Sequence, residues 1–175
     1  MFKYCPTCNS KNIKFVQENY FNCSDCDFIY YHNVASAVAA IIVYKGKILF
    51  TTRAQSPGIG LLDLPGGFVD PNETLEQALS REIKEELGVT INSWQYMCSQ
   101  PNTYRPNKIE YRTLDSVFYS EQKSTLNFEL QETEIREISW IRPEQIDFDN
   151  IAFSSIKAAL KHYLEEVLYT PPTSR

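Results

Sequence analysis

Three glutamates, Glu82, Glu85 and Glu86, carry the strongest chemical signal in the sequence, because their i, i+3 and i+4 spacing places them on one side of a helix. On a helical wheel they converge within about 100° of arc, and Glu82 and Glu86 fall inside an apolar stripe. Carboxylates turned toward a core repel one another unless a cation lies among them. Because all three are oxygen ligands, the natural occupant is a hard divalent cation such as Mg²⁺ or Mn²⁺.

The helix that positions these glutamates has a clear start and a clear end in the sequence. Thr74 is a good N-cap, Gln77 completes a capping box, and Gly88 stops the helix. The apolar stripe consists of Leu75, Ala78, Leu79, Ile83 and Leu87. A solvated charge run is the alternative interpretation; it suits Lys84, which points outward, but not the inward positions of Glu82 and Glu86.

The residues around this helix resemble the Nudix box. Gly67 is followed after five residues by Glu73 and, after seven more, by Arg81-Glu82-Ile83-Lys84-Glu85-Glu86-Leu87-Gly88-Val89, with no departure from the pattern. The resemblance implies a divalent-metal-dependent hydrolase that cleaves a diphosphate linked to a nucleoside. It also implies that the three glutamates bind Mg²⁺ or Mn²⁺, that Glu73 and Arg81 form an ion pair, and that the Gly66 carbonyl is a further ligand.

The mechanism implied by this resemblance is attack of water on one phosphorus of the diphosphate, with the bound metal lowering the pKa of that water. A glutamate that the metal does not fully occupy, which is Glu85, Glu86 or Glu134, would take the proton. The position of Glu134 resembles that of a downstream acidic residue in some family members. Glu132 and Glu137 are close rivals, and a surface acid in a loop is the alternative interpretation.

A second constellation consists of cysteines near the start of the chain. Cys5-Pro-Thr-Cys8 and Cys23-Ser-Asp-Cys26 are two C-x-x-C pairs separated by 14 residues, a spacing that suits a tetrahedral structural Zn²⁺ site. Disulfides or a redox pair are the alternatives, but no βαβ pattern surrounds the cysteines. So short a segment cannot fold on a core alone, so we expect the metal to stabilise it. RNA binding by this ribbon has little support, because only three lysines lie between Lys3 and Lys14.

Length and composition fit one ordinary domain plus a small module. The chain has 175 residues, 43% hydrophobic residues and a net charge of −5, which argues against a general nucleic-acid or anionic-membrane surface. No apolar run reaches the length of a membrane span and no signal peptide is visible, so we expect a cytoplasmic protein without a membrane partner. The predicted organisation is a zinc ribbon over residues 1–32, a Nudix domain over 33–170 and a disordered tail over 171–175.

The second unit mixes strands and helices in an order that fits the α/β/α sandwich of the Nudix family. Strands are expected over residues 34–44, 47–53, 89–99, 109–119 and 137–141, with a hairpin turn at Lys45-Gly46 and a closing helix over 153–168. Residues 54–62 contain Pro57, Gly58 and Gly60 and are expected to form a loop.

A zinc ribbon directly before a Nudix domain resembles the NADH pyrophosphatase branch of the family. The branch motif Ser-Gln-Pro-Trp-Pro-Phe-Pro is matched by Ser99-Gln100-Pro101 and then departs from it. Within that segment, Tyr104 is a candidate to stack on a base and Arg105 to pair with a phosphate, against a plain proline-bounded loop. Arg53, which ends a strand before the box, is a further phosphate candidate or else a surface arginine.

The predicted function is therefore hydrolysis of an NADH- or NAD-like dinucleotide or of ADP-ribose. The same reaction on a flavin or dinucleoside polyphosphate, or on the NAD cap of an RNA, remains open. A non-catalytic ligand-sensing or nucleic-acid-binding module is the alternative from another class, although such derivatives usually lose a carboxylate of the box and this chain retains all three. A homodimer is suggested only by the resemblance to the NADH pyrophosphatase branch.

Overall fold

The computed structural model describes residues 2–17, 19–105 and 110–168, and side chains as far as residue 166. The chain forms two compact units that divide after Val34, whereas the sequence-based boundary falls after residue 32. The tail expected at residues 171–175 lies outside the described residues.

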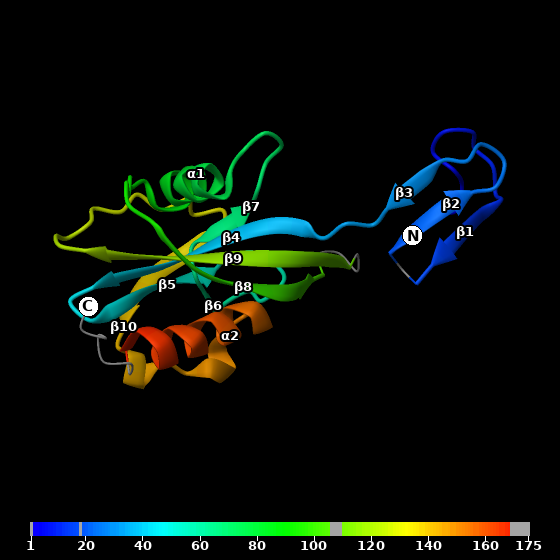
Figure 1. Ribbon diagram of the computed structural model, residues 1–175. Coiled ribbons are helices and arrows are strands. Elements are labelled where there is room, and N and C mark those ends of the chain that lie inside the picture. The colour runs from blue at the N-terminus through cyan, green and yellow to red at the C-terminus, as the bar shows by residue number, and fades with distance from the viewer. Residues whose placement is uncertain (1, 18, 106–109, 169–175) are drawn as a thin grey trace, which may run out of the picture. The chain divides into compact units, whose positions relative to one another are not determined.

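The first unit is a three-stranded antiparallel sheet in the order β1-β2-β3 (Figure 1). Its strands are β1 (Ile13–Val16), β2 (Tyr20–Cys23) and β3 (Ile29–Tyr31). Phe21 is almost fully buried, and its ring lies against the rings of Phe2, Phe15, Phe28 and Tyr30. The remaining buried apolar positions that the structure describes in this unit are cysteines, so the unit has very little hydrophobic core.

The second unit is built on a mixed sheet whose main path runs β10-β5-β4-β9-β8, with β6 beside β5 and β7 beside β4. Its strands are β4 (Ala35–Tyr44), β5 (Lys47–Arg53), β6 (Leu62–Asp63), β7 (Gly66–Phe68), β8 (Gln95–Tyr104), β9 (Tyr111–Gln122) and β10 (Ile135–Ile141). The central strand β4 is parallel to β9 and antiparallel to β5 and β7. The lysine-glycine turn predicted between β4 and β5 is confirmed, since Lys45 and Gly46 both have positive φ.

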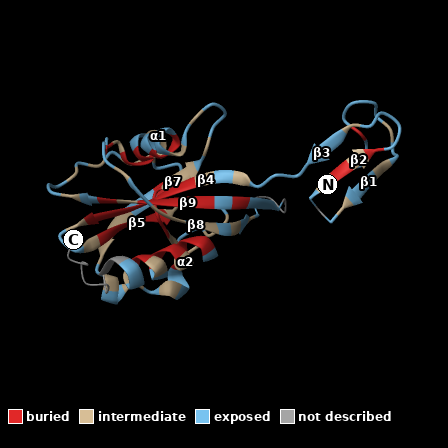
Figure 2. Cartoon of the chain, in the orientation of Figure 1, coloured by how far each residue is buried: buried red, intermediate tan, exposed pale blue. Residues whose placement is uncertain are grey.

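Two helices cover opposite faces of this sheet, which confirms the expected sandwich (Figure 1). Helix α1 (Leu75–Leu87) packs on one core, to which β4 contributes Val38, Ala40 and Ile42. Helix α2 (Ser154–Tyr163) packs on a second core, to which β4 contributes Ala39, Ile41 and Val43. Consecutive side chains of β4 therefore alternate between the two cores, as a strand buried on both faces requires. Figure 2 shows the resulting buried centre.

The strand expected over residues 89–99 differs from the one observed. Residues 89–94 have no regular structure, although Val89 and Ile91 are buried against the α1 core; β8 instead begins at Gln95 and continues to Tyr104. Residues 101–104 therefore belong to a strand rather than to a loop. Pro101 is tolerated there because β8 is the edge strand of the main path, where a missing N–H breaks no ladder on the outer side.

The C-terminal helix is shorter in α-helical form than the sequence predicts. Helix α2 covers Ser154–Tyr163 and continues as a π-helical segment over Leu164–Leu168. Two 3-10 turns precede it, over Pro143–Gln145 and Phe148–Asn150. Among the described residues, no helix is both long and apolar enough to cross a membrane.

Candidate active site and metal centre

The four cysteines of the first unit lie together in space. The Sγ atoms of Cys5, Cys8, Cys23 and Cys26 all fall within 4.8 Å of one another, and all four cysteines are free of disulfide bonds. Within the described part of the chain, this is the one group of three or more metal-ligating side chains close enough to hold an ion. Four sulfur ligands around one point suit a tetrahedral metal ion whose four coordination positions are all filled by the protein.

Two similar backbone turns bring these thiols together. The Asn9 N–H donates to the Cys5 carbonyl at 2.9 Å, and the Asp27 N–H donates to the Cys23 carbonyl at 3.1 Å. Asn9 and Asp27, the residues after each pair, have φ of 59° and 56°, in the left-handed region that both residue types tolerate. The Asp25 carboxylate then links the two turns by accepting from Ser10 Oγ and from Asn12 Nδ2.

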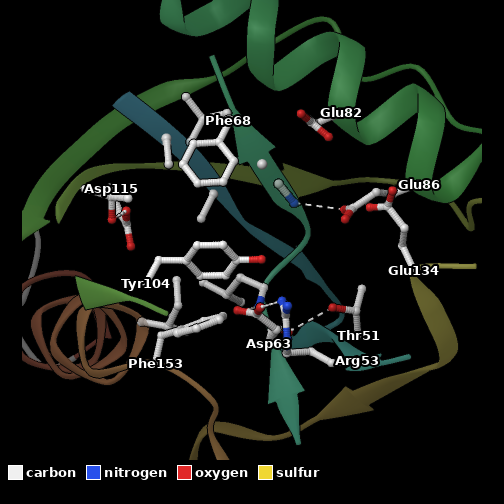
Figure 3. A pocket seen from close by; sticks show the side chains of 18 of the residues that line it. Thr51, Arg53, Asp63, Phe68, Glu82, Glu86, Tyr104, Asp115, Glu134 and Phe153 are labelled. Carbon is white, nitrogen blue, oxygen red and sulfur yellow. Dashed lines mark hydrogen bonds and ion pairs between the residues drawn. The ribbon is translucent and has the colours of Figure 1, made fainter. Parts of the chain in front are cut away.

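The second unit contains a cavity of about 410 Å³ between the segment that precedes α1 and the N-terminal end of α2. Figure 3 shows acidic side chains on one side of this cavity and aromatic side chains on another. The acidic lining residues are Asp63, Asp70, Glu82, Glu85, Glu86, Asp115 and Glu134. Arg53 is the one cationic side chain among the described lining residues, so the cavity carries a large excess of negative charge.

Helix α1 presents all three of its glutamates to this cavity. The Thr74–Gln77 capping box is formed, and the helix ends at Gly88 with φ 71°. Glu86 is 8% exposed and Glu82 is half-buried, whereas the Glu85 side chain is 54% exposed at the helix surface. The wheel position of each glutamate therefore agrees with its burial.

Arg81 fastens the loop before α1 to the helix. Its Nε and Nη2 atoms donate to the two carboxylate oxygens of Glu73 at 2.8 and 3.0 Å, and Nη2 also donates to the Phe68 carbonyl. This two-point contact lowers the pKa of Glu73. The Arg81 Nη1 atom reaches back along the helix to Glu82 at 2.9 Å and Glu85 at 3.1 Å. One guanidinium thus fixes the loop and orients two glutamates.

The two glycines before the helix make room for the glutamates. A Cβ at Gly67 would lie 2.5 Å from the Glu82 carboxylate, and one at Gly66 would lie 2.1 Å from the Val38 carbonyl oxygen. The Gly66 N–H donates to Glu86 Oε2 at 2.9 Å. These contacts explain why glycine is required at both positions if β7 is to pass between β4 and the carboxylates.

Burial raises the pKa of Glu86 well above its ordinary value, and the neighbouring charges of Glu82, Asp63 and Glu134 raise it further. Burial likewise raises the pKa of Glu82, although its bond to Arg81 opposes that shift. The pKa of Asp63 is raised to about 6 by burial, against the attraction of Arg53. Arg53 and Arg81 therefore do not fully compensate the negative charge at the acidic end of the cavity, and its oxygen donors fit a hard divalent cation.

The carboxylates of Glu82, Glu85 and Glu86 do not form a compact three-ligand group as the cysteines do. Glu82 and Glu85 each bond to Arg81 through one oxygen, whereas Glu86 bonds to the Gly66 N–H. Each carboxylate keeps a second oxygen with which to bind a cation.

Downstream of the helix, Glu134 lines the cavity, whereas its rivals Glu132 and Glu137 are not among the described lining residues. Its backbone is held in place because the Glu134 carbonyl accepts from the Ala54 N–H at 2.8 Å, next to the end of β5. Figure 3 shows its carboxylate beside that of Glu86.

Arg53 is fixed on three sides. Its Nε donates to the Pro57 carbonyl at 2.7 Å, its Nη1 donates to Asp63 at 2.7 Å, and its guanidinium lies 4.8 Å from the centre of the Phe153 ring. It lines the cavity as the sequence predicts for a phosphate-binding residue.

The Tyr104 ring lies in the cavity between two other aromatic rings. The ring centres of Phe68 and Phe153 lie 5.6 and 6.0 Å from that of Tyr104 (Figure 3). Arg105 follows the last residue of β8 and is not among the described lining residues of the cavity. Its side chain is exposed and pairs with Glu110 at 2.6 Å.

Sequence reasoning missed Phe68, Phe153, Asp63 and Asp115, all of which line the cavity. Phe68 follows the glycine pair directly, and Asp115 is an acid within an expected strand, so both carried a usable signal. Phe153 is the N-cap residue of α2, a position usually occupied by a polar residue. Asp63 had no signal of its own, because its role depends on the pairing of β6 with β5.

Comparisons with known proteins give a consistent picture. A family model described as the NUDIX domain matches residues 33–165. The chain is 29% identical over 145 residues to the NAD-capped RNA hydrolase NudC of Haemophilus influenzae (strain PittGG), covering 82% of this chain and 52% of that protein. It is 32% identical over 99 residues to the NudC of Vibrio atlanticus (strain LGP32), covering 57% and 36%. The chain thus spans about half or less of these relatives.

Among solved structures, the chain resembles a NUDIX hydrolase from Nitrosomonas europaea with a TM-score of 0.71 and 26% identity. That match covers 99% of this chain and 97% of the other, so it includes the cysteine unit as well as the sheet and helices.

Proposed function

Because the chain belongs to the Nudix family, we propose that its cavity hydrolyses the diphosphate bond of a nucleoside diphosphate linked to another moiety. One observation carries this proposal: a single cavity has a carboxylate end, formed by Glu82, Glu86 and Glu134, and an aromatic end around Tyr104. The first end suits cation-bridged phosphates, and the second suits a planar base. NADH, NAD⁺ and ADP-ribose are the leading substrate candidates.

The metal ligands of this proposal are Glu82, Glu85 and Glu86, with the Gly66 carbonyl as a further ligand. Mg²⁺ or Mn²⁺ bound there would neutralise phosphate charge and lower the pKa of water. Arg81 and Glu73 hold the ligands in place from outside the cavity. Within the described residues, Arg53 donates through Nε to Pro57 and through Nη1 to Asp63, and its Nη2 would donate to a phosphate oxygen.

The proton acceptor is one of Glu85, Glu86 and Glu134. All three lie on the cavity wall, and the two from α1 also have a role as ligands. Glutamine variants separate these roles: loss of a ligand weakens metal binding, whereas loss of the base lowers kcat at saturating metal.

A structural zinc ion held by the four cysteines is the second part of the proposal. The sulfur-only ligand set supports it, and four filled positions would leave none for catalysis. One metal ion per chain, measured after gel filtration, is the expected stoichiometry. A homodimer, suggested by resemblance to the NADH pyrophosphatase branch, is tested by light scattering on the same sample.

The NAD cap of an RNA is a second candidate substrate, because the relatives from Haemophilus and Vibrio are named as NAD-capped RNA hydrolases. In an NAD-capped RNA, the diphosphate of the NAD cap would be cleaved, and the RNA chain would extend out of the cavity. A flavin or a dinucleoside polyphosphate would undergo the same hydrolysis, so both are further candidate substrates. A ligand-sensing or nucleic-acid-binding module without catalysis is the remaining alternative.

The test is a product screen with Mg²⁺ and with Mn²⁺ over NADH, NAD⁺, ADP-ribose, FAD, diadenosine polyphosphates, nucleoside triphosphates and a short NAD-capped RNA. We expect AMP together with the partner monophosphate, such as NMNH from NADH. Glu85→Gln should abolish product formation, and Glu132→Gln, at an exposed acid outside the described cavity lining, should not. Absence of cleavage across the panel, in protein shown to bind metal, would favour the non-catalytic module.

A further inference from the structure

Asp115 is a buried carboxylate that the proposed hydrolysis does not use. It lies on β9, is 7% exposed and lines the cavity. In the view of Figure 3 it lies on the side of the Phe68 and Tyr104 rings that is away from Glu86 and Glu134. It therefore belongs to the aromatic end of the cavity rather than to the carboxylate end.

Three neutral groups hold this carboxylate in place. Its Oδ1 accepts from Thr113 Oγ1 at 2.6 Å, and its Oδ2 accepts from Asn102 Nδ2 at 3.1 Å and from Ser155 Oγ at 2.5 Å. These donors come from β9, β8 and α2, so three elements position one side chain. Neither an arginine nor a lysine is among the Asp115 partners found in the described chain, so its charge is uncompensated by an ion pair.

The arrangement leaves hydrogen-bond acceptors and fixes their positions. A carboxylate can accept about four hydrogen bonds, and three are occupied here. Because Asn102 donates its amide nitrogen to Asp115, its Oδ1 atom is left as a second acceptor on the same wall. Buried acceptors of this kind favour a ligand that supplies N–H donors and disfavour one that presents only acceptors.

We infer that Asp115, supported by Asn102, is a specificity-determining residue that accepts a hydrogen bond from an amino group on the edge of the ring bound at the aromatic end. This inference rests on the proposed function, since it identifies the substrate class for the same cavity. The shared chemistry is a planar heteroaromatic ring with an –NH₂ donor, which both adenine and the carboxamide of nicotinamide provide. Nicotinate lacks that donor and presents oxygen acceptors instead, and hypoxanthine has a carbonyl oxygen in place of the amino group, with a donor only at the neighbouring ring nitrogen.

Two matched ligand pairs identify the source of the amino group. ADP-ribose against inosine diphosphate ribose reports the adenine amino group, and NAD⁺ against nicotinic acid adenine dinucleotide reports the carboxamide. Dissociation constants are measured by calorimetry in metal-free buffer, so that binding is read without hydrolysis. We expect the wild-type protein to favour the amino member of one pair by about 10- to 100-fold, the range of a hydrogen bond to a charged group.

Asp115→Asn should reduce that preference to near unity, because the amide can donate as well as accept. Glu121→Gln is the matched control, since it makes the same change at an exposed acid farther along β9 and should retain the preference. If Asp115→Asn fails to fold, Asn102→Ala tests the same wall at a half-buried position and should lower the preference several-fold.

Collapse of either preference in Asp115→Asn supports the inference and names the ring. Equal binding within both pairs by the wild-type protein would overturn it, as would a preference that survives Asp115→Asn and Asn102→Ala. The proposed function is tested separately. If the protein shows the binding preference but hydrolyses nothing with Mg²⁺ or Mn²⁺, the proposed function fails and the inference stands. If the protein hydrolyses the substrates but shows no preference, only the inference is refuted.

Discussion

The cysteine site and the carboxylate site reach their positions in opposite ways. In the first unit four thiols gather around one point on a segment with almost no core, so the ligands themselves are the centre of the structure. In the second unit the carboxylates lie on the wall of a cavity above two packed cores whose described members are all hydrophobic and include none of the proposed ligands. The fold of the first unit should therefore depend on its ion, and that of the second should not.

The two sites also differ in how charge is managed. At the carboxylate site, Arg81 donates to Glu82 and Glu85, whereas Glu86 accepts from the Gly66 N–H. Within the described residues, the partners of the clustered thiols are backbone N–H groups and one another rather than arginine or lysine. A loosely arranged site of hard ligands can admit and release an ion with substrate, whereas a compact sulfur site holds its ion permanently.

The largest effect is expected from breaking the cysteine site. Cys8→Ser should remove its metal ion and unfold the first unit, because that segment lacks a hydrophobic core of its own. Amide NMR spectra should lose the dispersed signals of residues 2–34 and keep those of the second unit. Cys98→Ser, at the cysteine outside the cluster, is the control and should retain the metal. Metal-free Cys8→Ser with an ordered first unit would contradict the comparison.

Breaking the carboxylate site should abolish activity and leave the fold intact. Glu85→Gln removes the charge of a proposed ligand at an exposed position, so we expect turnover to fall by more than about 100-fold, beyond the loss typical of an outer-shell partner. Near-UV circular dichroism should be unchanged. Activity close to that of wild type would exclude Glu85 from the metal site.

Loosening the support of that site should have a smaller effect. Arg81→Lys keeps the charge but loses the two-point contact with Glu73, and we expect kcat to fall by about 10- to 100-fold. A higher Mg²⁺ requirement should accompany the loss, because Glu82 and Glu85 are then less well oriented. Arg136→Lys, at an exposed arginine on β10, is the control and should be neutral.

The charge imbalance of the carboxylate site should be visible in the metal-free protein. Since burial raises the pKa of folded Glu86, stability falls as pH rises above the unfolded pKa of about 4.3 and through the folded pKa. Glu86→Gln removes this contribution, so we expect its Tm to exceed that of wild type by roughly 5 °C at pH 8. At pH 4 the two proteins should differ less. If the Tm difference between the two proteins is the same at pH 4 and at pH 8, the charge of Glu86 is already compensated in the folded protein.

The smallest effect concerns the start of the helix that bears the ligands. Thr74→Ala deletes half of the capping box, which should cost about 1 kcal/mol of unfolding free energy and leave kcat unchanged. Urea unfolding measures the loss, with Thr90→Ala as the exposed control. A large fall in kcat would mean that the cap also positions the glutamates.

What the sequence predicted well was local. The burial of Glu82 and Glu86 follows from helical periodicity within the thirteen residues of α1, and the cap and the stop follow from the residue types that flank it. The cysteine turns follow from a short repeated spacing. What it predicted poorly depends on partners distant in the chain. Tyr104 joins the cavity because β8 pairs with β9, and Asp115 is held by residues from β8 and α2, which no local pattern reveals. The placement of β8 was missed because an edge strand can contain proline.

The central claim is that one unit holds its ion for folding and the other for catalysis. The most direct test passes the whole protein through metal-free buffer, counts the tightly bound metal, and then measures NADH and ADP-ribose cleavage as Mg²⁺ or Mn²⁺ is added back. The account predicts one retained ion per chain, no cleavage before addition, and activity that rises with added Mg²⁺ or Mn²⁺ while the retained ion stays in place. Cleavage that persists without added metal, or that follows the cysteine-bound ion, would contradict it.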